Sequence, residues 1–137
     1  MTASLPDQAR AWLDDPFFAT IATIEPDGRP QLSVVWVARD GDDVLVSTVK
    51  GRRKHANLVR DPHVTLLLSP PDRPYAYIEI RGTVTAMTEE PDDPDARGLI
   101  DRLAKKYRDL DVYPDDVPGA VRVKVRITPD KVVLRGV

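Results

Sequence analysis

The sequence predicts a mainly β fold: a small antiparallel β-barrel with two or three short helices, in one domain over residues 1–137. Three observations support this prediction. Roughly seven short segments rich in β-branched and aromatic residues alternate with turn-forming residues. Segments with helical spacing of apolar residues are few and short. The chain of 137 residues has the usual length of a single domain.

The predicted strands follow the apolar runs between turn signals. Residues 17–24 and 31–39 flank a Pro-Asp-Gly turn at 25–30, which is typical of a β-hairpin. A second turn at 39–43 leads into residues 44–49, so we expect these three strands to form an antiparallel meander. The remaining predicted strands are 63–69, 75–87, 121–127 and 130–137.

Three segments predict helices. The first is 5–14 with Ser4 as its N-cap, and the second lies within 50–62 and ends before Pro62. The third covers roughly residues 96–108, where apolar residues share a face at helical spacing. It follows an acidic run at 89–95 and precedes a loop at 109–119.

Residues 121–127 alternate valine with basic residues. The valines face one way, and we expect the bases on the other face to point to solvent, as charged residues on a strand usually do. Those bases are Arg122, Lys124 and Arg126.

Composition excludes several classes of protein. With 20 basic and 22 acidic residues the net charge is −2, so a nucleic-acid or phosphate site would require a local basic patch. The absence of cysteine excludes disulfides, thiolate metal sites and cysteine nucleophiles, and it fits a reducing cytoplasm. No apolar run has the length of a membrane span, and the first residues lack the pattern of a signal peptide. We therefore expect a soluble cytoplasmic protein without membrane association.

Common catalytic motifs are absent. The sequence has no nucleophile elbow, no phosphate-binding P-loop and no dinucleotide-binding glycine motif. Its only histidines, His55 and His63, lack nearby ligand partners, so we expect no metal site. An enzyme with this sequence would take its reactive group from a cofactor.

The most informative segment is the basic turn at residues 50–54. It holds Lys50, Arg52, Arg53 and Lys54 directly after a predicted strand and at the start of a predicted helix. A helix N-terminus offers unpaired N–H donors to an anion, whereas basic side chains there do not stabilise the helix itself. This mismatch favours a bound phosphate, and a solvated basic turn remains the alternative.

The order of several motifs resembles a known family. These motifs are DGRPQLSVVWV, STVKGRRK followed by NLVRDP, and YIEIRGTV followed by RLAKKY. Together they resemble the pyridoxamine 5′-phosphate oxidase-like split β-barrel flavoproteins. The resemblance is closer to the actinobacterial branch of PPOX-class oxidoreductases that depend on coenzyme F420, a deazaflavin. It extends over about residues 5–136.

The resemblance implies roles for individual residues. The basic turn would hold the cofactor phosphate, and Arg suits phosphate because it binds in a bidentate manner. Polar and aromatic side chains of the 31–37 strand would line the ring system, two hydroxyls would bind near the phosphate, and two tyrosines would reach the site from a second subunit. These residues are Lys50, Arg52, Arg53 and Lys54; Gln31, Ser33 and Trp36; Ser47 and Thr48; and Tyr75 and Tyr77.

Each of these roles has a plain structural alternative. The aromatic residues could simply pack in the core or an interface, and Gln31 and Ser33 could lie on an ordinary exposed strand face. Tyr75 or Tyr77 is a candidate proton donor, and no other catalytic residue is assigned.

The resemblance implies an oxidoreductase, and F420 is preferred over FMN as its cofactor. The chain ends in DKVVLRGV without the segment that binds pyridoxal phosphate in the oxidase branch. A basic strip from Lys50 to Lys54, extended by Arg60, suits the anionic tail of F420. The reduced deazaflavin would transfer a hydride from C5 to a conjugated small-molecule acceptor. FMN-dependent chemistry and F420 binding without turnover remain alternatives.

Two expectations concern partners. Residues 33–37 and 63–69 are apolar on both strand faces, so a second copy is expected to cover them in a homodimer with sites at the interface. A nucleic-acid-binding barrel that uses the basic 50–60 helix is a more remote alternative. It is disfavoured because base-stacking aromatics are missing and the net charge is negative.

Overall fold

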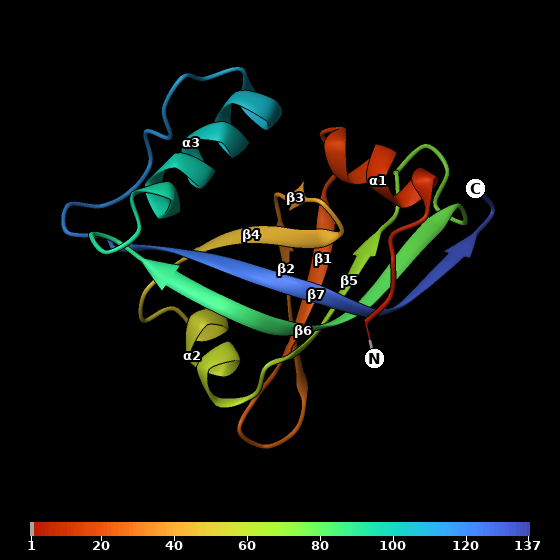
Figure 1. The fold of residues 1–137 in the computed structure, drawn as a ribbon, viewed down its shortest axis with the longest axis horizontal. Coiled ribbons are helices and arrows are strands. Elements are labelled where there is room, and N and C mark those ends of the chain that lie inside the picture. The colour runs from red at the N-terminus through yellow and green to blue at the C-terminus, as the bar shows by residue number, and fades with distance from the viewer. Residues whose placement is uncertain (1) are drawn as a thin grey trace.

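In the computed structural model, which describes residues 2–137, one antiparallel sheet of seven strands curves around a core (Figure 1). The strand order is β2-β1-β5-β6-β7-β4-β3. The mainly β, split-barrel prediction is confirmed. The strands are β1 (Ala19–Ile24), β2 (Pro30–Val35), β3 (Ala38–Asp40), β4 (Asp43–Val49), β5 (His63–Leu68), β6 (Tyr77–Glu89) and β7 (Arg122–Arg135). The helices are α1 (Asp7–Asp14), α2 (Arg53–Arg60) and α3 (Pro94–Arg108).

The predicted meander is wrong. The chain forms two hairpins, β1–β2 and β3–β4, and these lie at opposite edges of the sheet. Val35 is the last residue of β2 with a partner on β1, because β1 begins at the opposite residue, Ala19. Beyond Val35 the chain therefore crosses over, and Ala38 pairs with β4 instead. The predicted strand 31–39 is thus two strands.

The two strands predicted after residue 120 are one continuous strand, β7. It runs past Pro129 because that residue lies opposite Gly82, where the register of the β6–β7 ladder shifts. Proline cannot donate to a ladder, and a bulge is one of the few places where a sheet tolerates it. A Cβ on Gly82 would lie 2.6 Å from Ile127 Cγ2, so the close approach of the strands requires glycine there.

Helix ends differ slightly from the predictions. The first helix begins at Asp7 with Pro6 as N-cap and no side-chain cap, so Ser4 does not cap it. The third helix begins earlier than expected, because the Asp93 side chain accepts a hydrogen bond from the backbone N–H of Asp95.

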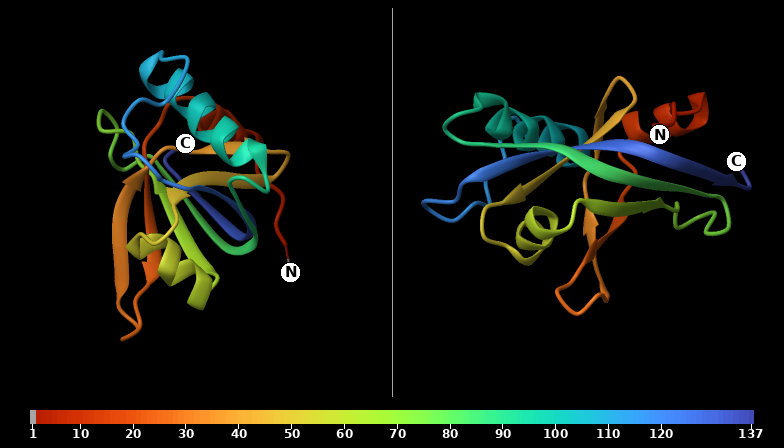
Figure 2. Two further views of the ribbon diagram at one scale, coloured as in Figure 1. Left: turned by 90° about the vertical axis from the view of Figure 1, so that its left-hand side faces the viewer. Right: turned by 60° about the horizontal axis from the view of Figure 1, so that its bottom comes forward.

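The core has two parts, separated by β4. Val44 and Val46 face the barrel interior, which α1 covers with Trp12 and Leu13. Leu45 faces the other way, against Leu99, Ile100 and Leu103 of α3. Figure 2 shows α3 and α2 on opposite sides of the strands. β4 is therefore buried on both faces, with the barrel interior on one side and α3 on the other.

The prediction that the β7 bases point to solvent is wrong. The outer face of β7 is covered by α3, by the loops around it and by the β3–β4 hairpin, and carboxylates from these segments pair with all three bases. Arg122 is only 3% exposed and binds Asp116. The other pairs are Lys124 with Asp93 and Asp95, and Arg126 with Asp40 and Asp43.

One outer face of the sheet carries exposed apolar side chains. Leu32 and Val34 on the edge strand β2 are 61% and 67% exposed, and Leu67 on β5 is 38% exposed. We call these three residues the outer apolar patch. Thr20 lies between Val34 and Leu67 in the strand register, so the patch extends across neighbouring strands. None of the helices within residues 2–137 is long and apolar enough to cross a membrane.

Candidate functional site

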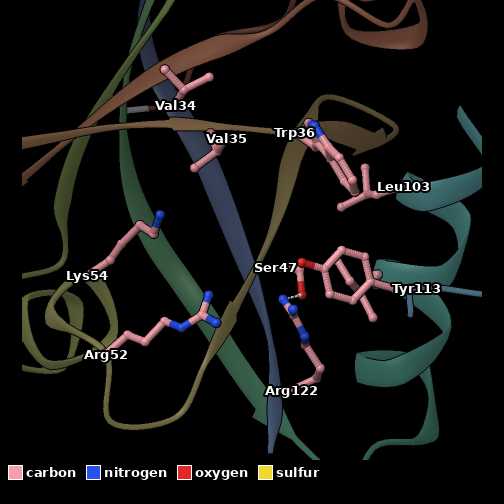
Figure 3. A pocket seen from close by; sticks show the side chains of 10 residues that line it. Val34, Val35, Trp36, Ser47, Arg52, Lys54, Leu103, Tyr113 and Arg122 are labelled. Carbon is pink, nitrogen blue, oxygen red and sulfur yellow. Dashed lines mark hydrogen bonds between the residues drawn. The ribbon is translucent and has the colours of Figure 1, made fainter. Parts of the chain in front are cut away.

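An open cleft of about 160 Å³ lies where β2, β4, the start of α2 and the side of α3 meet (Figure 3). One half is basic and polar, and the other is apolar and aromatic. Its lining residues are Val34, Val35, Trp36, Ser47, Arg52, Lys54, Ile100, Leu103, Tyr113 and Arg122.

The structure sorts the four bases of the turn into two pairs. Lys50 Nζ lies 2.9 Å from Glu89, and Arg53 lies 3.2 Å from Glu25, so both are neutralised outside the cleft. Arg52 and Lys54 line the cleft, and within residues 2–137 neither forms an ion pair with a carboxylate. The cleft therefore receives two uncompensated positive charges from this turn.

The backbone of the turn adds to this positive potential. Arg52 is the N-cap of α2, and no side chain caps the helix. The first N–H groups of a helix have no partners within the helix, and the helix dipole is positive at this end. Gly51 has φ +92°, which lets the strand end and the helix start in a tight turn.

Lys54 is held at the border of the cleft. Its Nζ donates to Ser33 Oγ at 3.0 Å. Burial lowers the pKa of Lys54, and the positive charges of Arg52 and Arg122 lower it further. A bound anion would offset all three unfavourable effects, so the site is suited to a phosphate or carboxylate.

Arg122 lies in the same cleft, but its charge is compensated. It donates from Nε and Nη2 to Asp116 at 2.9 and 2.6 Å and from Nη1 to Ser47 Oγ at 3.3 Å. Its guanidinium also lies 4.8 Å from the Tyr113 ring centroid. Asp116 in turn accepts from Arg97, which also binds Glu90. Arg122 thus supports the cleft wall rather than offering a free charge.

The aromatic half of the cleft is built on Trp36. Its ring stacks on Tyr107 with 5.3 Å between centroids and 7° between planes. Tyr113 meets the same ring edge-on, at 5.9 Å and 83°. Leu103 of α3 completes the wall. A flat, hydrophobic wall beside two free cations suits a planar ligand that carries an anionic group.

The structure brings together five of the residues predicted from the sequence. Trp36, Ser47, Arg52 and Lys54 line the cleft directly, and Ser33 joins them through Lys54. Sequence reasoning missed six lining residues, which are Val34, Val35, Ile100, Leu103, Tyr113 and Arg122. Ile100 and Leu103 were recognisable as an apolar helix face, but their exposure to a cleft was not. Arg122 is held in the cleft by Asp116, and the backbone N–H of Tyr113 donates to Asp101 of α3; no local sequence pattern signals either contact.

Two predicted polar residues do not line the cleft. Thr48 follows Ser47 on β4 and so faces the interior, where it is 1% exposed and its hydroxyl has no partner. Gln31 Oε1 accepts from Thr23 Oγ1 at 3.0 Å, and that hydroxyl also accepts from Asn57 at 3.0 Å. Thr48 is therefore buried inside the barrel, and Gln31 is held at the edge strand β2 by its hydrogen bond with Thr23.

The remaining predicted residues lie elsewhere. Tyr77 begins β6, at the end of the sheet remote from α2, and Tyr75 in the preceding loop is 89% exposed. Arg60 binds Asn57 Oδ1 and the carbonyl of Ile24, so the predicted basic strip does not continue along α2. Within residues 2–137, no three His, Asp or Glu side chains are grouped to hold a metal ion.

Comparison with protein families identifies the fold family. The family model for pyridoxamine 5′-phosphate oxidase matches residues 5–135. The chain belongs to this family. The matched range includes the strands that frame the cleft and the basic turn.

Solved structures with a similar fold carry names that indicate different activities. A protein described as an F420 reductase is 28% identical, with a TM-score of 0.79 and coverage of 94% of this chain and 98% of its own. A putative pyridoxamine 5′-phosphate oxidase from Listeria innocua is 22% identical, with a TM-score of 0.68 and coverages of 93% and 95%. The heme storage protein HutZ from Vibrio cholerae is 16% identical, with a TM-score of 0.67 and coverages of 98% and 96%. The last two show the shared fold alone.

Proposed function

We propose that this protein is an oxidoreductase that binds coenzyme F420 in the cleft and reduces a conjugated small molecule. The observation that carries the proposal is the pairing of two uncompensated cations, Arg52 and Lys54, with the aromatic wall at Trp36. The 28% identity to an F420 reductase over almost the whole of both chains supports the choice of cofactor.

The residues of the cleft fit such a cofactor. Arg52 and Lys54, with the uncapped start of α2, would hold its phosphate. Trp36, Leu103 and Tyr113 would lie against its ring system. When bound, the deazaflavin supplies hydride transfer from its C5 to an electron-poor acceptor.

The protein's own contribution would be orientation and exclusion of water. Lys54 is fixed by Ser33, and Ser47 is fixed by Arg122, so the polar half of the cleft is organised before a ligand binds. The apolar half restricts access of water to the ring.

A homodimer is part of the proposal. Val34 belongs both to the cleft lining and to the outer apolar patch, so a second copy covering the patch would also cover the mouth of the cleft. Tyr77 alternates with the buried Ile78 and therefore lies on the outer face of β6. The family resemblance implies that Tyr75 and Tyr77 of the second copy would reach this cleft, where either hydroxyl could supply a proton. Light scattering tests the assembly, and a monomer that binds one cofactor per chain would contradict it.

Parallel fluorescence titrations with F420 and FMN test the cofactor assignment. We expect saturable, stoichiometric F420 binding, followed by oxidation of reduced F420 when quinones or enones are added. Tight FMN binding without F420 binding would instead favour a flavoprotein. F420 binding without turnover of any acceptor would favour a cofactor-binding protein.

A further inference from the structure

The break between β2 and β3 leaves the backbone of Val37 outside both strand ladders. This residue is fully buried, so its N–H and C=O need partners within the protein. Two consecutive residues of α3 provide them. The Tyr107 hydroxyl accepts from the Val37 N–H at 3.1 Å, and Lys106 Nζ donates to the Val37 carbonyl at 2.6 Å.

The same two side chains also bind the end of α1 and the segment that leads from it to β1. Tyr107 donates its hydroxyl hydrogen to the Phe17 carbonyl at 2.6 Å, and Lys106 donates to the Leu13 carbonyl. Leu13 lies in the last turn of α1, which has no basic residue of its own. A cation at this position satisfies a terminal carbonyl and complements the helix dipole. Lys106 and Tyr107 thus connect α3 to the β2–β3 crossover and to the segment from the end of α1 to β1.

The contacts of Lys106 and Tyr107 lie directly beside Trp36. The Tyr107 ring is stacked almost parallel on the Trp36 ring, while its hydroxyl holds the next residue in the chain, Val37. The backbone and the ring of the Trp36–Val37 unit are therefore held by one helix. None of these contacts of Lys106 and Tyr107 involves Arg52 or Lys54, the free cations of the basic half of the cleft.

We propose that Lys106 and Tyr107 act as a positioning clamp for Trp36, and that the clamp governs binding of the planar part of a ligand while leaving the anion site unaffected. The identity of the ring ligand rests on the proposed function, but the positioning of Trp36 does not. The clamp residues are positioning residues, since neither lines the cleft.

Tryptophan fluorescence tests the clamp without any ligand. The chain has two tryptophans, so a Trp12→Phe background isolates Trp36. In that background we expect Tyr107→Phe and Lys106→Met each to raise acrylamide quenching of Trp36 at least twofold. Lys105→Met, one position earlier and paired only with exposed carboxylates, is the matched control and should leave quenching unchanged. Lys106→Arg, which retains donors, should recover most of the protection.

Ligand binding tests the second half of the proposal. In both clamp variants we expect F420 affinity to fall at least fivefold while calorimetric affinity for inorganic phosphate stays unchanged. Equal losses for both ligands, or unchanged F420 affinity despite increased quenching, would overturn the role in ring binding. Unchanged quenching in either folded variant would overturn the clamp. If the wild-type protein does not bind F420, the proposed function fails, and quenching still decides whether the clamp holds Trp36.

Discussion

The basic turn before α2 and the outer face of β7 carry similar positive charges but use them in opposite ways. On β7, Arg122, Lys124 and Arg126 each meet a carboxylate from a covering segment. At the turn, Arg52 and Lys54 meet none within residues 2–137. A basic side chain therefore indicates an anion site only where the fold leaves its charge uncompensated.

The largest expected effect comes from removing the carboxylate that compensates Arg122. We expect Asp116→Asn to lower the free energy of unfolding by about 3–5 kcal/mol, because a buried guanidinium loses its partner. Asp115→Asn removes the exposed partner of Arg108 and should change the free energy of unfolding by less than about 1 kcal/mol. Urea denaturation of the two variants measures the difference. Equal stability would mean that the buried pair contributes no more than a surface pair.

The turn should show the opposite behaviour, with an effect on binding and little on stability. We expect Arg52→Ala and Lys54→Ala each to weaken F420 binding by roughly 1–3 kcal/mol, the usual contribution of a charge-assisted hydrogen bond. Lys50→Ala and Arg53→Ala remove charges that are already paired with Glu89 and Glu25. These two variants should therefore weaken F420 binding by less than about 0.5 kcal/mol. Fluorescence titration compares the four variants. Similar losses in all four variants would favour the expectation from the family resemblance, in which all four basic residues hold the cofactor phosphate.

Lys106 differs from the bases of β7 because its ammonium group donates to backbone carbonyls and forms no ion pair with a carboxylate among residues 2–137. Burial lowers its pKa from 10.5 to about 8, opposed by the charges of Asp14 and Asp15. The folded protein therefore binds this proton less readily than the unfolded chain, so stability should rise with pH between about 8 and 10.5. We expect a gain on the order of 1–2 kcal/mol after solvent screening, absent in Lys106→Met. Denaturation at several pH values measures it. Identical pH profiles for both proteins would show that Lys106 is not the cause.

The sequence predicted most of the local structure because periodicity and turn residues are local signals. It missed the pairing of β2 and β3, since the crossover at Trp36–Val37 depends on where β1 begins. It also missed the continuity of β7 past Pro129, which a glycine on the neighbouring strand makes possible. Both errors arise from contacts between distant segments.

In the candidate site too, the features carried by a local segment were predicted, whereas those that depend on contacts between distant segments were missed. The basic turn was recognisable from charge density, but its separation into free and paired cations depends on Glu25 in the β1–β2 turn and on Glu89 at the end of β6. Arg122 was assigned to solvent because its partner, Asp116, lies in a loop without regular structure. Charge compensation is a tertiary property, and one sequence does not reveal it.

The smallest expected effect comes from replacing Thr48, whose hydroxyl is adjacent to that of Ser47 along β4. Ser47 lies in the cleft and accepts from Arg122, whereas Thr48 is buried on the other face with no partner for its hydroxyl. Replacing an unpaired buried hydroxyl by a methyl group of similar shape removes a desolvation penalty. We therefore expect Thr48→Val to raise the free energy of unfolding by up to about 1 kcal/mol and to leave F420 affinity unchanged. Denaturation and titration of this variant measure both quantities. A loss of affinity would return Thr48 to the phosphate-binding role that the family resemblance implied.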